Sequence, residues 1–321
     1  MAVIAMDLGG TKLAGALLTG GGAVRHRRVA PIEHRGGDEV GELIRNTTRA
    51  LLGLARKERL RVTSIGVCVP GISNARTGRV WAPNIPGWKD YPLRREIRGA
   101  AAKEARIGGR GTRRIPVVID SDRACCILGE TWRGSARGCH DAIYLSVGTG
   151  IGAGIMADGQ VLRGPGGIAG SIGWFALDRP FRSEYEECGC FEYHASGEGL
   201  AKVAEEMKWP NLGKEGISAA EIFAAYHRGN PAAKAIIAQA VEFWGMAVAN
   251  LVSLFNPQKI IFGGGVFGPA VELLDQILEE ARKWAQPIAV RQVKLEGSRL
   301  GGDAGLYGAA YLALRMAKEI Q

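Results

Sequence analysis

The chain has 321 residues, with 41 lysines and arginines against 32 acidic residues, which gives a formal net charge of +9. Its hydrophobic fraction of 46% contains no apolar run of about 18 residues or more, so the composition predicts no membrane helix. The basic residues are scattered or form short clusters such as Arg25–Arg28. We therefore interpret the charge as a solvated surface and expect no nucleic acid and no membrane among the partners.

The first residues, MAVIAMDLGG, form an apolar run with no basic leader and no small-residue cleavage site, which predicts a cytoplasmic protein. The six cysteines lack the spacing of a disulfide framework, which favours a reducing compartment. Arginine greatly outnumbers lysine, and asparagine and glutamine are scarce. This composition is typical of a thermophile.

An internal repeat predicts the fold class. IAMDLGGTKLAGALLTGG, at residues 4–21, resembles IYLSVGTGIGAGIMADGQ, at residues 143–160, without a gap, so that Gly9 falls on Gly148. Each copy has an apolar strand, a glycine-rich turn and a second apolar strand, the pattern of a β-hairpin that opens an α/β domain. The sequence therefore predicts two related α/β domains.

The remaining elements follow in chain order. After the first hairpin we expect a strand at 23–32, a helix at 38–59 and strands at 62–71 and 115–120. After the second we expect helices at about 197–208, 218–228 and 231–255, a strand at 259–264, a helix at 269–285 and a strand at 293–295. This order implies mixed sheets with helices on their faces. The predicted division is a small domain, 1–121 joined by the final helix 303–321, and a large domain, 122–302.

The chain has no GxxxxGK[ST] loop, so the sequence argues against a P-loop enzyme and a nucleotide would have to be bound in another way. Three glycine clusters are the candidates for phosphate and nucleotide binding. The first turn offers backbone N–H groups, a hydroxyl and an ammonium from Gly9, Gly10, Thr11 and Lys12, with Asp7 placed to hold hydrated Mg²⁺. The second turn, predicted to bind the same phosphates, contains Gly148, Thr149, Gly150 and Gly152. The third, where glycine permits close approach of an adenosine, comprises Gly263, Gly264, Gly265 and Val266. The alternative for each cluster is an ordinary tight turn.

Five ordered motifs together resemble the ROK family of sugar kinases: DLGGTK from residue 7, APNIPGW at 82–88, DSDRACCILGE at 120–130, GTGIGAG at 148–154 and GGGV at 263–266. The resemblance runs from residue 4 to about residue 310. It implies an actin/hexokinase-like, or ribonuclease H-like, fold with two α/β domains flanking a cleft. It also implies an ATP-dependent hexose kinase that uses Mg²⁺, with the 6-hydroxyl of glucose as the first acceptor to test.

The resemblance assigns roles to four residues between positions 71 and 122. Asp122 corresponds to the aspartate that accepts the proton of the sugar hydroxyl, a task that suits a carboxylate during phosphoryl transfer. Its alternative role is that of the N-cap of the following helix, and the two roles are compatible. Asn84 corresponds to a sugar-binding asparagine, with a turn residue as the alternative. Ser121 replaces the usual asparagine, and Gly71 is also placed in the predicted sugar set.

The sequence departs from the family at its zinc site. Relatives commonly carry GExGH followed by CxCGxxGCxE, in which the histidine and three cysteines bind a structural zinc. Ser171 and Trp174 replace the glutamate and the histidine in a segment that also contributes to the sugar pocket. Ser183 and Tyr185 stand at the first two cysteine positions, so we predict no structural zinc. Aromatic packing is expected in its place from Trp174, Phe175, Phe181, Tyr185 and Phe191.

Glu192 keeps its register at the end of the lost zinc motif. The resemblance implies that it hydrogen-bonds the sugar, and the alternative is a solvated residue near a helix start. The expected partners are a small-molecule hexose and ATP, and the expected state is a monomer or a homodimer. The altered pocket leaves another acceptor open, such as an N-acetyl amino sugar, fructose or a polyol.

Two other functions remain as alternatives. A sugar-responsive repressor of the same family carries a helix-turn-helix segment ahead of the glycine turn, which here begins at residue 7, so the sequence favours a kinase. A non-catalytic sugar sensor is the other alternative. The retention of Asp122 and of the three glycine clusters favours catalysis over this second possibility.

Overall fold

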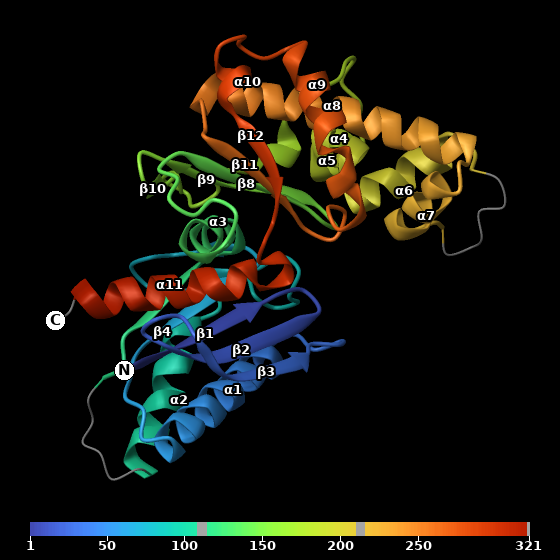
Figure 1. The fold of residues 1–321 in the computed structure, drawn as a ribbon. Helices are drawn as coiled ribbons and strands as arrows, with labels where there is room; N and C mark the ends of the chain where they lie inside the picture. Colours follow the sequence, from blue (N-terminus) through green and yellow to red (C-terminus); the bar gives the residue numbers. More distant parts are fainter. Residues whose placement is uncertain (108–113, 210–215, 320–321) are drawn as a thin grey trace. The chain divides into compact units, whose positions relative to one another are not determined.

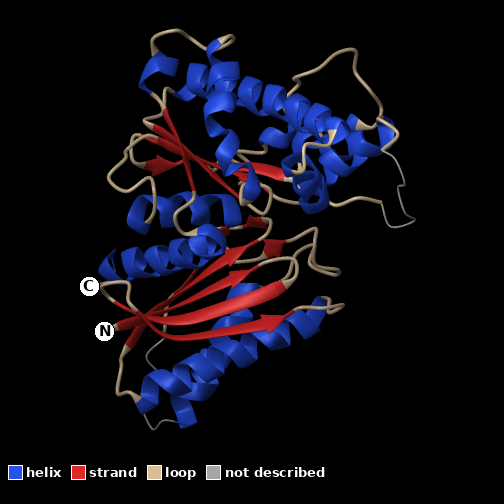
Figure 2. Cartoon of the chain, turned by 45° about the vertical axis from the view of Figure 1, so that its right-hand side comes forward, coloured by secondary structure: helices blue, strands red, loops and turns tan. Residues whose placement is uncertain are grey.

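The computed structural model describes residues 1–107, 114–209 and 216–319 (Figure 1). Contacts along the chain define two compact units. Unit 1 comprises Met1–Arg133, Arg163–Ile168 and Asp303–Gln321, and unit 2 comprises Gly134–Leu162 and Ala169–Gly302. Each unit is built on a five-stranded mixed sheet with helices packed on it (Figure 2), which confirms the predicted α/β class.

The sheet of unit 1 has the order β3-β2-β1-β4-β7. Its strands are β1 (Ala2–Leu8), β2 (Lys12–Thr19), β3 (Val24–Pro31), β4 (Val62–Val69) and β7 (Val117–Ser121). The first three strands are antiparallel, whereas β4 runs parallel to both β1 and β7. Successive residues of β1 enter two different cores, Ile4 and Met6 on one face and Val3 and Ala5 on the other. Because both faces are covered, β1 is apolar throughout.

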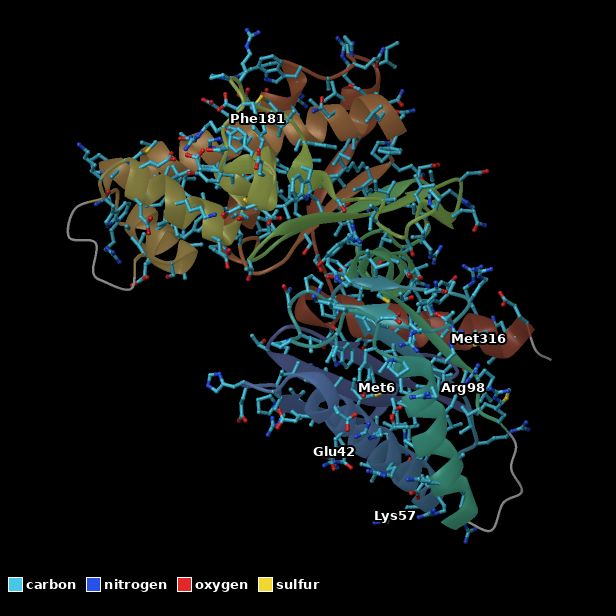
Figure 3. The ribbon with its side chains drawn as sticks, turned by 180° about the vertical axis from the view of Figure 1, so that it is seen from behind. Met6, Glu42, Lys57, Arg98, Phe181 and Met316 are labelled. Atoms are coloured by element: carbon cyan, nitrogen blue, oxygen red, sulfur yellow. The ribbon has the colours of Figure 1, made fainter. Side chains whose placement is uncertain are left out.

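Helices α1 (Gly37–Lys57) and α2 (Leu93–Ile107) pack together on one face of this sheet, and α3 (Asp122–Arg133) and α11 (Ala304–Glu319) pack on the other (Figure 1). Met6, labelled in Figure 3, lies in the first core beside Thr48 of α1. On the other face, a Cβ atom at Gly66 of β4 would stand 1.9 Å from the backbone oxygen of Ala309. This glycine therefore allows a close approach of α11 to the sheet. Two further short strands, β5 (Ile72–Ser73) and β6 (Val80–Trp81), pair with each other.

The sheet of unit 2 has the order β10-β9-β8-β11-β12 and repeats the topology of unit 1. Its strands are β8 (Ala142–Val147), β9 (Ile151–Ala157), β10 (Gln160–Val161), β11 (Lys259–Gly263) and β12 (Lys294–Gly297). As in unit 1, three antiparallel strands are followed by two parallel ones. Both hairpins that the repeat predicts are therefore confirmed, with glycine turns at equivalent places.

Unit 2 carries the 3-10 turns η1 (Ile172–Trp174) and η2 (Pro269–Leu273). Its helices are α4 (Tyr185–Cys188), α5 (Cys190–Ala195), α6 (Gly197–Glu206), α7 (Ala219–His227), α8 (Pro231–Phe255), α9 (Leu274–Arg282) and α10 (Ala289–Gln292). The Asn230 side chain caps α8 by accepting the N–H of Ala233, and Asn256 ends the helix in the left-handed region with φ +43°. α8 is long and apolar enough to cross a membrane, but 67% of its apolar window is buried. It is therefore the core helix of unit 2.

The predicted helix at 231–255 is confirmed to the residue, and the helix predicted at 38–59 appears as α1. The helix predicted at 269–285 is divided into η2 and α9, with Pro269 opening the first part. The sequence pattern gave no element for α2, α4, the short strands or the 3-10 turns at η1. α4, the short strands and η1 are too short to show the periodicity on which sequence-based prediction rests, whereas α2 has 15 residues and was missed despite its length.

Candidate active site

The first glycine turn joins β1 to β2 in unit 1. The N–H of Gly9 donates to the carbonyl of Lys12 over 2.9 Å and closes the turn, while Gly10, Thr11 and Lys12 are exposed. The site for a Cβ at Gly10 is 3.9 Å from the Cβ of Asn84, so the turn and Asn84 are neighbours. The exposed backbone and side-chain donors of this turn match those expected of an anion-binding turn.

Asp7 is the penultimate residue of β1, two residues before Gly9 of this turn. Burial raises the pKa of its carboxyl from 3.8 to about 6, although the Cys68 thiol donates a hydrogen bond that opposes the change. The negative charge of Asp122 raises the pKa further, and the Lys12 ammonium lowers it. Gly305, in the first turn of α11, packs on the carboxylate, since a Cβ there would stand 2.7 Å from an Asp7 oxygen. Asp7 thus combines burial with ionisation at neutral pH.

Asp122 is the first residue of α3. Its carboxylate accepts the N–H of Arg123 over 2.8 Å, and the side chain keeps access to solvent. Desolvation by the surrounding protein raises the pKa of the Asp122 carboxyl, and the hydrogen bond from the Arg123 N–H opposes this change. The capping contact comes from Ser121, whose hydroxyl accepts the N–H of Ala124 over 3.3 Å. Ser121, rather than Asp122, therefore caps α3 at the third helical N–H.

Asn84 and Gly71 lie in the loops that precede α2. A turn closes around Asn84 through the bond from Ile85 N–H to the Ala82 carbonyl, 3.1 Å long. The Asn84 side chain is exposed and has no hydrogen-bond partner among the residues that the structure describes. A Cβ at Gly71 would stand 2.1 Å from the Trp81 carbonyl oxygen, so this glycine is required by backbone packing.

Asp120, Arg123 and Arg163 form a network around the start of α3, and none of the three was singled out from the sequence. Arg163 donates two hydrogen bonds to Asp120, of 2.7 and 3.0 Å, and Asp120 also accepts the N–H of Ser121. Arg123 donates to the carbonyls of Gly167 and Ile168. These contacts fasten the segment 163–168 to the helix start that carries Asp122. The first acid of the DSD motif was the available signal for this network.

The second glycine turn, in unit 2, joins β8 to β9. The Gly148 N–H donates to Gly150, and the Gly197 N–H donates to the Gly148 carbonyl, over 2.9 and 2.7 Å. Val266 N–H donates to the carbonyl of Val147 at 3.1 Å and places the third glycine cluster beside the turn. The structure thus brings together the two clusters of this unit that the sequence predicts to bind nucleotide.

These two clusters share a pocket of about 630 Å³ within unit 2. The pocket is lined by Gly148, Thr149, Gly197, Glu198, Ala201, Ile217, Ser218, Ala219, Ala220, Phe223, Gly265, Val266 and Pro269. Gly263 and Gly264 do not line it: a Cβ at Gly263 would stand 2.0 Å from the Tyr144 hydroxyl, and Gly264 has φ +88°. Within the third cluster, the first two glycines therefore serve backbone packing, and only Gly265 and Val266 face the pocket.

Glu192, in α5, contacts the second glycine turn. Its Oε2 atom accepts the N–H of Ile151 over 2.6 Å, and a Cβ at Gly150 would stand 2.7 Å from the same oxygen. Burial raises the pKa of Glu192, and the hydrogen bond from Ile151 opposes this. The residue is half-buried in this contact and is not a solvated helix-start residue.

The region that corresponds to the zinc motif is organised around His194. The buried imidazole Nε2 lies 2.7 Å from the Tyr185 hydroxyl, its ring stacks on Phe243 at 4.3 Å, and burial lowers its pKa. Tyr185 also donates to Asp178. Among the described residues, no three His, Cys, Asp or Glu side chains gather as a metal site.

The aromatic packing predicted for this region is only partly correct. Tyr185 and Phe191 are buried, and Phe175 packs against the core. Trp174 and Phe181 are 58% and 70% exposed, so the predicted burial is wrong for both, although the Phe181 ring contacts the Tyr185 ring edge-on at 6.1 Å (Figure 3 labels Phe181). Ser183 bonds the neighbouring Glu184, and Ser171 stands before η1. The Cβ position of Gly173, which precedes the exposed Trp174, is 2.9 Å from Glu192 Oε2, so Gly173 and Glu192 are neighbours.

Two mixed sheets of the same topology, each with a glycine turn after its first strand, define the actin-like ATPase fold class. The ROK family model matches residues 3–316. The chain belongs to the ROK family.

Known proteins with similar sequences and structures carry several activities. A glucokinase from Halalkalibacterium halodurans is 30% identical over 322 residues, covering 96% of this chain and 94% of that protein. An N-acetyl-D-glucosamine kinase from Photobacterium profundum is also 30% identical, over 78% of this chain and 80% of its own. Among solved structures, a ROK hexokinase from Thermus thermophilus has 31% identity and a TM-score of 0.78, with 99% and 100% of the two chains covered. A ROK glucokinase from Streptomyces griseus in complex with glucose and AMPPNP has 26% identity and a TM-score of 0.75, with 98% and 100% covered.

Proposed function

We propose that the chain is an ATP-dependent sugar kinase in which Asp122 is the general base. The observation that carries the proposal is the division of roles at the start of α3. Ser121 caps the helix, and the Asp122 carboxylate remains accessible to solvent. A carboxylate with a raised pKa suits the acceptance of a hydroxyl proton late in a loose phosphoryl-transfer transition state. The kinases among the relatives support this chemistry.

The pocket of unit 2 is the proposed site of the nucleotide. Its volume of about 630 Å³ is in the range of small-molecule sites, and apolar Ala201 and Phe223 suit a flat base. Gly265 and Val266 border the same pocket, while Gly148 and Thr149 are proposed to contact phosphate. The complex of the Streptomyces griseus relative with AMPPNP supports ATP as the donor.

The first glycine turn, with Gly9, Gly10, Thr11 and Lys12, is proposed to bind the transferred phosphoryl group together with Mg²⁺. Asp7 fits the metal, because its carboxylate is ionised at neutral pH and Mg²⁺ prefers oxygen ligands while keeping several waters. When bound, Mg²⁺ neutralises the charge that develops on the phosphate oxygens.

The proposed acceptor is a hexose phosphorylated at its 6-hydroxyl, with glucose the first to test. Asn84 supports this, because its exposed amide offers both a donor and an acceptor to vicinal hydroxyls. Gly71, Ser121 and Glu192 complete the proposed sugar set. A second acceptor class, amino sugars or other hexoses, is also supported. Ser171 and Trp174 stand where the family has two residues that make polar contacts with the sugar.

The proposal also covers the surroundings of the site. We infer that the region around Tyr185 and His194 is stabilised without zinc. All six cysteines are free thiols, which agrees with a cytoplasmic location. The division into domains at 1–121 with 303–321, and at 122–302, remains our proposal; the contacts of the structure group Asp122–Arg133 and Arg163–Ile168 with unit 1.

The test is an assay of ADP release in a coupled system with ATP and Mg²⁺ over hexoses, amino sugars and polyols. We expect sugar-dependent ADP release that disappears in Asp122→Asn, while ATP alone gives little turnover. Absence of turnover with every acceptor would contradict the kinase proposal. A matched control, Glu187→Ala, changes an exposed carboxylate of α4 and should leave the activity unchanged.

A further inference from the structure

The carboxylate of Glu192 lies against the backbone of the second glycine turn. Oε2 accepts the Ile151 N–H over 2.6 Å, and a Cβ at either Gly150 or Gly173 would stand 2.7 or 2.9 Å from that oxygen. Gly150 and Gly173, from two different segments, therefore both pack against this carboxylate, and neither position has room for a Cβ atom. The contact spans 41 residues of sequence and is the point where α5 meets the turn between β8 and β9.

The same turn also borders the proposed nucleotide pocket. Gly148 and Thr149 line that pocket, and the bond between Gly148 N–H and the Gly150 carbonyl closes the turn. A hydrogen bond from a backbone amide to an ionised carboxylate is among the stronger hydrogen bonds in proteins. Glu192 thus restrains a turn that also borders the pocket.

The second oxygen of Glu192 has no hydrogen bond among the residues described, so one carboxylate offers one oxygen to the turn and one to a ligand.

We propose that Glu192 is a positioning residue that couples the nucleotide and the sugar: it holds the second glycine turn in its phosphate-binding conformation while its free oxygen binds the acceptor. The proposal rests on the proposed kinase function. Because coupling between two binding sites is reciprocal, a sugar bound to Glu192 strengthens nucleotide binding, and the nucleotide strengthens sugar binding by the same factor.

The variants Glu192→Ala and Glu192→Gln separate the two roles. Alanine removes the acceptor of the Ile151 N–H, whereas glutamine keeps a neutral carbonyl acceptor of the same length. For binding of AMPPNP with Mg²⁺ and no sugar, measured by calorimetry, we expect affinity about tenfold weaker in Glu192→Ala and close to wild type in Glu192→Gln. Glucose should strengthen AMPPNP binding in the wild type and not in Glu192→Ala.

Hydrogen exchange of the peptide that contains Ile151 gives a readout independent of catalysis. We expect faster exchange there in Glu192→Ala, rescue in Glu192→Gln, and wild-type exchange in Glu187→Ala, which alters a nearby exposed carboxylate that lacks this contact. Unchanged sugar-free AMPPNP affinity and unchanged exchange in Glu192→Ala would overturn the coupling while leaving the kinase function intact. Failure of the wild type to bind AMPPNP would overturn both.

Discussion

The protonation of Asp7 is expected to set the acid limit of the activity. Burial raises the pKa of Asp7 from 3.8 to about 6, and we propose that only its ionised form holds hydrated Mg²⁺. With a pKa of about 6, about nine-tenths of the carboxyl is ionised at pH 7 and about one-tenth at pH 5. kcat/KM for MgATP at saturating sugar should therefore fall about tenfold between these two values.

The Cys68 thiol provides a test that distinguishes Asp7 from Asp122, whose pKa is also raised. Cys68→Ala removes a hydrogen-bond donor from Asp7 and should move the acid limit upward by about half a pH unit or more. Cys68→Ser supplies a stronger donor and should move it downward. The measurement is the pH dependence of MgAMPPNP binding as well as of kcat/KM. Movement in the same direction in both variants, or full activity at pH 5, would refute the reasoning.

The same shift has a consequence for stability. The folded state binds more protons than the unfolded state between pH 3.8 and about 6, so stability falls as pH rises through this window. A difference of about two pKa units corresponds to about 3 kcal/mol at higher pH. The fold tolerates this cost at a residue that we place in the active site, and Asp7→Asn should recover part of it in urea unfolding at pH 7.

The remaining predictions concern the base, the zinc-free region and the packing of α11. Asp122→Asn should lower kcat by about 10²- to 10⁴-fold with no fall in the unfolding midpoint, because Ser121 retains the cap; a kcat above one-tenth of wild type would remove Asp122 as the base. Tyr185→Phe should lower the free energy of unfolding in urea by about 1–2 kcal/mol, because it loses its hydrogen bonds with His194 and Asp178. A chelator should leave the stability of the wild type unchanged. Stoichiometric zinc in a metal analysis would contradict the prediction of a zinc-free region. Gly66→Ala should cost more than about 2 kcal/mol, because its Cβ would stand 1.9 Å from the Ala309 oxygen, whereas Gly99→Ala, in the open on α2, should gain about 0.5–1 kcal/mol. Equal effects of the two glycine variants would show that the contact between β4 and α11 is not as close as described.

Sequence could predict the parts of this fold that depend on local pattern. The apolar strands on either side of each glycine turn predicted both hairpins, and the helical period of residues 231–255 predicted α8. These features depend on residues close in sequence, where periodicity and turn chemistry act directly.

The remaining features depend on contacts between distant segments. Nothing local to Glu192 reveals that its partner is Ile151, 41 residues away. The cap of α3 is a local contact, but Ser121 and Asp122 are adjacent and both residue types are favoured at the N-cap, so the pattern does not choose between them. Hydrophobicity also misplaced Trp174 and Phe181, because a large apolar side chain is buried only if a surface meets it. The glycines at 263 and 264 resemble ligand contacts in sequence, whereas packing against Tyr144 and Val147 requires them.

The central claim is transfer of a phosphoryl group from ATP to the 6-hydroxyl of a hexose. Phosphorus NMR of a reaction with ATP, Mg²⁺ and glucose tests it most directly, with Asp122→Asn as the matched negative. The account predicts loss of the γ-phosphate signal and the appearance of a sugar 6-phosphate ester in the wild type alone. Release of inorganic phosphate without an ester, or no consumption of ATP with glucose or any other hexose, would contradict it.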